Sequence, residues 1–195
     1  MNLGKLEEVS RIATQETSAA LSKMLKTSVT VVAHSVKGLS VDALFQEINQ
    51  AEVNVVISAP VVGDLEGNLS LLFSKESALH VADLLLKKES KTVLGDYTAE
   101  QRTALEELAN VLAGNYLRAF SKELGAKSVL HRAGFFYSGT LDSMRAHIFS
   151  SLAQVPSEGN LVGILFTCEE QRMKGHVVIL LSSERLEKVG GGVLA

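Results

Sequence analysis

Two long stretches of the chain place apolar residues at helical spacing, and each is followed by short runs rich in β-branched residues and leucine. In segments 6–25 and 99–124 the apolar positions recur every three or four residues, which predicts amphipathic helices. The runs that follow have strand length and are separated by Gly, Pro and Asp signals. The predicted strands are 28–36, 52–61 and 68–73 after the first helix, and 128–139, 145–155, 160–166 and 175–181 after the second.

The two helical segments are also similar in sequence. An offset of 99 residues, which carries Glu8 onto Glu107, lays segment 6–25 over segment 105–124. The agreement lies toward the two ends of the overlap, where Glu7-Glu8 meets Glu106-Glu107 and Ser22-Lys23 meets Ser121-Lys122, with apolar residues matched beside them. Each half of the chain then ends in a similar helix start. This pattern indicates an internal duplication with two copies, rather than a longer array.

Strands outnumber helices, and few connections are long enough for repeated βαβ crossovers. The predicted fold class is therefore α+β, with a mostly antiparallel sheet and two long amphipathic helices packed on it. No linker rich in Pro, Gly and Ser divides the halves. We expect one domain, 1–195, built of half-repeats of about 1–90 and 91–195 that are related by pseudo-twofold symmetry.

Charge and composition exclude several classes of function. The net charge is −3 and there is no long basic run, so nucleic-acid binding is not expected. No apolar stretch has the length of a membrane-spanning helix, and the first residues do not resemble a signal peptide. The one cysteine, Cys168, fits a reducing compartment, and we expect a cytoplasmic protein.

The second helix carries a narrow polar stripe. At about 100° per residue, Glu107 and Asn110 lie roughly 60° apart and can reach the same external object. The stripe consists of Thr103, Glu107, Asn110, Gly114, Arg118 and Ser121, and the apolar face of Leu105, Leu108, Leu112, Tyr116 and Phe120. A carboxylate that can pair with a cation, beside an amide that can hold a water molecule, suits phosphoryl hydrolysis.

The same spacing of Glu and Asn also occurs by chance on many amphipathic helices, so the duplicated context carries the functional interpretation. No other catalytic motif is present in the sequence. The five histidines are scattered without ligand spacing, and we expect no metal site. The aromatic run 135–137 is interpreted as core packing, with a partner-facing surface as the alternative.

With Thr103, Glu107 and Asn110 at these positions, the chain resembles the CheC/CheX/FliY family of response-regulator phosphatases. The resemblance implies that Glu107 pairs with the lysine of a phosphorylated CheY-like receiver domain, while Asn110 orients a water molecule for attack on phosphorus. Thr103 would support that contact, and Gly114 would let another surface approach. The resemblance further implies no cofactor of the chain's own, since the receiver carries the Mg²⁺.

The first copy departs from this pattern, because Arg11 stands where the second copy has Asn110. A guanidinium only donates hydrogen bonds, and it would add positive charge beside the receiver's lysine. We therefore expect the site at Glu8 and Arg11 to be degenerate.

Two alternatives to hydrolysis stay open. One is a non-catalytic adaptor that binds a receiver domain or a CheD-like deamidase. The other is a flagellar-switch component, although members of that kind usually carry an extra domain for which we expect no residues here. Either a monomer or a homodimer is compatible with the expected sheet edges.

Overall fold

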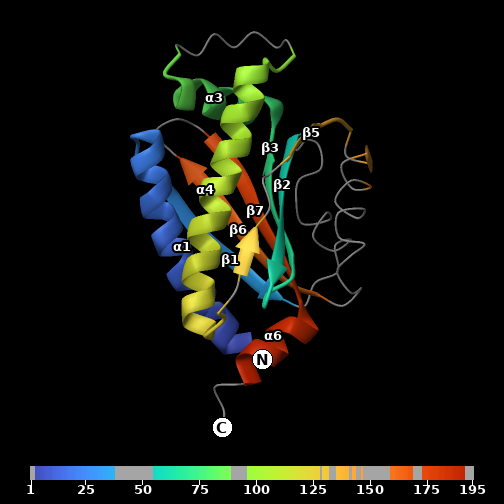
Figure 1. Cartoon of the computed structure of the whole chain (residues 1–195). Helices are drawn as coiled ribbons and strands as arrows, with labels where there is room; N and C mark the ends of the chain where they lie inside the picture. Colours follow the sequence, from blue (N-terminus) through green and yellow to red (C-terminus); the bar gives the residue numbers. More distant parts are fainter. Residues whose placement is uncertain are drawn as a thin grey trace.

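The computed structural model describes residues 3–37, 55–88, 96–127, 129–131, 135–140, 142–143, 146, 159–168 and 173–191. These residues form an α+β structure (Figure 1). The helices are α1 (Leu3–Leu25), α3 (Lys75–Leu86), α4 (Ala99–Leu124) and α6 (Ser183–Gly191). The strands are β1 (Thr30–Lys37), β2 (Val55–Gly63), β3 (Gly67–Phe73), β4 (Val129–His131), β5 (Phe135–Ser138), β6 (Gly159–Cys168) and β7 (Met173–Ser182).

The strands build a single sheet in the order β1-β6-β7-β3-β2-β4, with β5 pairing a different part of β2. All of the described pairings are antiparallel, which confirms the predicted class of sheet. The predicted strand 128–139 divides into β4 and β5. The predicted strand 145–155 lies outside the described residues, apart from residue 146, which is helical, so the prediction is wrong at that position.

Helices α1 and α4 lie side by side across one face of the sheet and run in opposite directions (Figure 1). The odd-numbered residues of β2 from Val55 to Val61 point toward these helices and are buried in the same core as them. The five apolar residues expected to face the sheet, Leu105, Leu108, Leu112, Tyr116 and Phe120, are all buried. The period of the helix therefore separates a buried face from an outer face, as the sequence predicts.

Both ends of α4 follow from local chemistry. Thr98 and Gln101 form a capping box, in which each side chain accepts a hydrogen bond from the other residue's backbone N–H. At the other end Gly125 takes the left-handed conformation with φ 72°, which glycine adopts without steric cost. The position and length of α4 are thus specified within its own segment.

The junction between the two halves of the chain is tight. Strand β3 of the first half pairs with β7 of the second over seven residues, from Gly67 opposite Leu181 to Phe73 opposite Gly175. A Cβ atom at Gly67 would lie 1.9 Å from the carbonyl oxygen of Leu180, so only glycine fits there. The halves therefore share one continuous sheet.

Candidate functional site

The polar stripe of α4 lies on the outer face of the helix, away from the sheet. Thr103 and Glu107 are exposed, while Asn110 and Gly114 are partly buried. On a regular helix Glu107 and Asn110 have Cβ atoms about 5–6 Å apart. The structure thus places the predicted acid and amide together, on a surface that a partner could reach.

Glu106 precedes Glu107 in the helix, but its carboxylate is already engaged, so Glu107 is the acid that is available to a partner. Glu106 Oε1 accepts a hydrogen bond of 3.2 Å from the backbone N–H of Phe136 in β5. The ring of Phe136 also packs edge-on against Tyr97 at 4.9 Å and lies 5.6 Å from the guanidinium of Arg102. Glu106 therefore holds β5 against the helix, whereas Glu107 faces outward. Phe136 serves core packing, as expected for the run 135–137.

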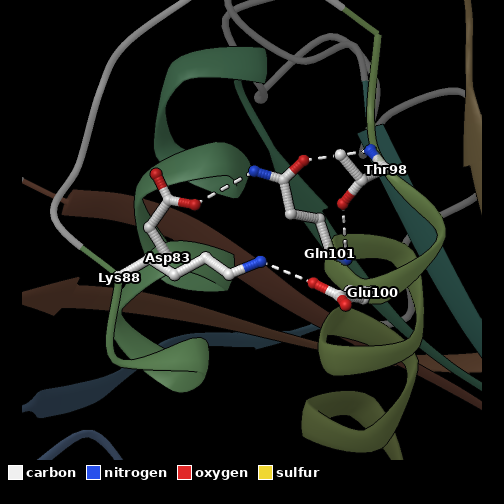
Figure 2. Close-up of polar contacts among 5 residues, drawn as sticks. All are labelled: Asp83, Lys88, Thr98, Glu100 and Gln101. Carbon is white, nitrogen blue, oxygen red and sulfur yellow. Dashed lines mark hydrogen bonds and ion pairs between the residues drawn. The ribbon is translucent and has the colours of Figure 1, made fainter.

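The start of α4 is fixed by a network that reaches α3 (Figure 2). Gln101 donates from Nε2 to Asp83 Oδ1 at 3.0 Å, while its Oε1 completes the capping box with Thr98. Asp83 is only 7% exposed. An exposed ion pair between Lys88 and Glu100 lies beside these contacts and lowers the pKa of the Glu100 carboxyl. The network sets the position of the helix about 9 Å along its axis from Glu107.

The residues expected to form a degenerate first site lie on α1. Glu8, Arg11 and Gln15 are all exposed there. The opposite side of α1 is buried and includes Thr14 and Thr17, whose hydroxyls donate to backbone carbonyls one turn earlier. The two predicted sites therefore lie on outer faces of neighbouring helices, and α1 carries Arg11 where the predicted alignment places Asn110 on α4.

A pocket of about 400 Å³ opens beside the stripe, between the C-terminal half of α4 and β4. Its lining comes from Gly114, Leu117, Arg118 and Ser121 on α4, and from Ala126, Lys127 and Val129 after it. The helical wheel already places Gly114, Arg118 and Ser121 on the polar stripe. It could not find Lys127 and Val129, because they reach the pocket only through the turn at Gly125.

Other kinds of site receive no support in the part of the chain that the structure describes. No group of three or more His, Cys, Asp or Glu side chains there could hold a metal ion. Within the same residues, no helix is long and apolar enough to cross a membrane. The side chain of Cys168 lies outside the described residues.

No protein-family model matches the sequence. Several solved structures, among them the following three, are similar to the chain over nearly their whole length. Thermotoga maritima FliY has a TM-score of 0.70 at 17% identity, covering 97% of this chain and 95% of FliY. CheX in the CheX–CheY–BeF3–Mg²⁺ complex of Borrelia burgdorferi has a TM-score of 0.59 at 18% identity, covering 89% and 97%. The FliM middle domain of Vibrio alginolyticus has a TM-score of 0.57 at 13% identity, covering 94% and 96%.

The molecule therefore has the fold of these solved structures, an architecture that FliY, CheX, a CheC-like superfamily protein and the FliM middle domain share. Among the three structures described above, FliY has the highest TM-score. At these levels of identity the likeness establishes the fold and leaves the chemistry to the residues of this chain.

Proposed function

We propose that this protein hydrolyses the phosphoaspartate of a CheY-like receiver domain, using one site on α4. The observation that carries the proposal is the pair Glu107 and Asn110, one turn apart on the outer face of a long helix in a CheC-like fold. A CheX of this fold has been solved together with CheY, BeF3 and Mg²⁺, which supports a receiver as the partner.

In the proposed reaction Glu107 accepts a hydrogen bond from the receiver's lysine and so seats α4 over the phosphoaspartate. The amide oxygen of Asn110 accepts a hydrogen bond from a water molecule and aims the water's lone pair at phosphorus. The new bond joins the water oxygen to phosphorus, and the bond between phosphorus and the aspartate oxygen breaks. Inorganic phosphate leaves with the water's protons, and the receiver recovers its carboxylate.

No metal or other cofactor of the chain's own enters this proposal. The receiver's Mg²⁺ would neutralise the charge on the phosphoryl oxygens. Thr103, one turn before Glu107, would support the docking contact, and Gly114 would allow close approach. We place the reaction in the cytoplasm with a phosphorylated response regulator as the partner, and neither nucleic acid nor a membrane takes part.

The test is the rate of phosphate release from a phosphorylated CheY-like receiver with Mg²⁺. Wild-type protein should accelerate release, and Asn110→Ala should return the rate to that of the receiver alone, because the water loses its orienting group. Removal of one such preorganised group costs about 10²–10³ in rate at other enzymes. Arg11→Ala is the matched control on α1, and it should leave the acceleration within about twofold, because the first copy is degenerate.

Equal rates for wild type and Asn110→Ala would exclude Asn110 as the catalytic amide. A loss of acceleration in Arg11→Ala would show instead that the first copy takes part in the reaction.

The second candidate function is a non-catalytic adaptor that docks a receiver, or a CheD-like deamidase, without hydrolysing anything. Two observations favour this candidate. The fold is also similar to that of the FliM middle domain. In addition, position 103 is a threonine, whereas the CheC/CheX/FliY family that the sequence resembles has Ser or Asp there. Tight binding of a receiver with an unchanged rate of phosphate release would select this candidate.

We also propose that the chain is a duplicated single domain. If β1 is exchanged with β4/β5, β2 with β6, and β3 with β7, the result is the same order of strands read from the opposite edge of the sheet. This supports pseudo-twofold symmetry. The antiparallel placement of α1 beside α4 agrees with such an axis (Figure 1).

A further inference from the structure

The pocket between α4 and β4 combines apolar walls with a cationic rim. Leu117, Ala126 and Val129 form much of its lining, and Gly114 leaves its near edge without a side chain. Arg118 and Lys127 are exposed at the pocket. Its shape and composition suit an apolar side chain that has an acidic neighbour.

Among the residues that the structure describes, no ion pair neutralises the charges at this rim. No hydrogen bond or ion pair of the Arg118 or Lys127 side chain occurs within the described ranges. The carboxylate of Asp64 accepts a hydrogen bond of 2.8 Å from the backbone N–H of Lys127, so it is engaged with the chain. Ser121 donates its hydroxyl to the carbonyl of Leu117. Both cations therefore remain available to a partner's carboxylates.

The pocket continues the stripe that carries the proposed catalytic pair. Arg118 lies about 20° around the helix from Glu107, and about 12 Å along the axis from Asn110. A stable protein interface covers about 800 Å² on each partner, which corresponds to a disc of about 16 Å radius. A folded domain that is centred on Asn110 therefore also covers the pocket.

We propose that this pocket is a second docking contact for the same receiver domain, which inserts an apolar side chain between α4 and β4 and pairs adjacent carboxylates with Arg118 and Lys127. The proposal rests on the proposed function for the choice of partner. A phosphorylated receiver that lacks an acidic group at this position would bind less tightly, so the contact selects among receivers. A small free anion is a poorer occupant, because both cations are exposed and the walls are largely apolar.

The experiment separates docking from hydrolysis. The probes are the CheY-like receiver domains of the source organism, each activated with beryllofluoride and Mg²⁺, and binding is measured by titration calorimetry at low and at high salt. Arg118→Glu should raise the Kd of the receiver that wild type binds most tightly by about tenfold or more at low salt. The effect should shrink at high salt, because exposed charges are screened. Lys127→Glu should act in the same direction.

The matched control is Lys23→Glu, which makes the same change of charge at an exposed position in the last turn of α1. It should leave Kd within about twofold of wild type. With the phosphorylated receiver as substrate, Arg118→Glu should raise KM while kcat stays within about twofold, since Asn110 is unchanged. Circular dichroism of each variant verifies that it is folded.

Each remaining outcome is informative. If Arg118→Glu and Lys23→Glu had the same Kd and KM, the pocket would not be a docking contact, while the proposed hydrolysis would stand. If wild type bound a receiver without accelerating phosphate release, and Arg118→Glu weakened that binding, the docking contact would stand and the hydrolysis would fail. Binding to none of the receivers would overturn both. A fall in kcat as large as that of Asn110→Ala would overturn a role confined to docking.

Discussion

At the scale of single residues, neighbouring positions on one helix have different roles because their surroundings differ. Glu106 is held by the backbone of Phe136, while Glu107 is exposed one residue further along. On the buried side, the ring of Tyr116 is stacked on Phe120 with 5.6 Å between their centroids. The Tyr116 hydroxyl and the Ser10 hydroxyl of α1 are both buried and lie close to each other, but neither makes a hydrogen bond of normal geometry within the described residues. Such buried, unpaired polar atoms reduce stability.

We therefore expect Tyr116→Phe to leave the free energy of unfolding at pH 7 unchanged, or to raise it by up to about 1 kcal/mol. Burial raises the pKa of the Tyr116 hydroxyl, so the folded state keeps this proton above pH 10, where the unfolded chain loses it. The unfolded state then binds fewer protons, and wild-type stability falls as the pH rises above about 10. Urea unfolding at pH 7 and pH 11 should show the advantage of Tyr116→Phe growing with pH.

Tyr97→Phe is the control for this prediction. Burial also raises the pKa of Tyr97, but its hydroxyl donates to the carbonyl of Lys75 at 3.3 Å. Tyr97→Phe should therefore cost about 0.5–1.5 kcal/mol at pH 7. A loss above 2 kcal/mol in Tyr116→Phe would mean that its hydroxyl has a partner after all.

At the scale of elements, α4 is held at its start by a contact that the sequence pattern does not reveal. The capping box of Thr98 and Gln101 is readable from the sequence, since both residues belong to one turn. The bond from Gln101 to Asp83 joins positions 18 residues apart and depends on how α3 packs (Figure 2). One side chain thus serves a local cap and a tertiary contact.

Gln101→Glu separates these two roles. Glutamate can keep the capping box, but its carboxylate would face the buried carboxylate of Asp83. We expect a loss of about 1–3 kcal/mol in the free energy of unfolding at pH 7, larger than the loss in Gln101→Ala. The difference between the two variants should shrink at pH 4, because protonation of the introduced glutamate removes the repulsion. Urea unfolding at both pH values checks this, and a pH-independent difference would contradict it.

At the scale of the whole molecule, the two halves of the chain depend on each other. The junction pairs β3 with β7, β1 pairs with β6, and α1 packs against α4, so each half covers apolar surface of the other. Their shared core is what makes a single domain the simplest interpretation.

We therefore expect fragments 1–90 and 91–195 to be unfolded when they are produced separately, and the whole chain to unfold in one cooperative transition. Each fragment alone would expose an unpaired sheet edge and half of the core. Far-UV circular dichroism measures the secondary structure of each fragment, and thermal melts show whether it unfolds cooperatively. The folded control is the whole chain with a protease site inserted after residue 90, measured before cleavage. A cooperative melt of either fragment would show that the halves are independent.

The sequence by itself determined the features that depend on contacts within a few turns of chain. The limits of α4, its buried and outer faces, and the spacing of Glu107 and Asn110 all follow from helical period and capping. The antiparallel α+β class followed as well, because strand runs and short connections leave few alternatives. Only the tertiary structure decided the order of the strands, the bond of Gln101 to Asp83, the engagement of Glu106, and the pocket at Arg118. The first three join segments that are distant in the chain, and packing of the whole core, rather than local preference, brings them together. The pocket is lined by residues 114–129 alone, but it forms only because the chain turns back at Gly125 and places β4 beside the helix.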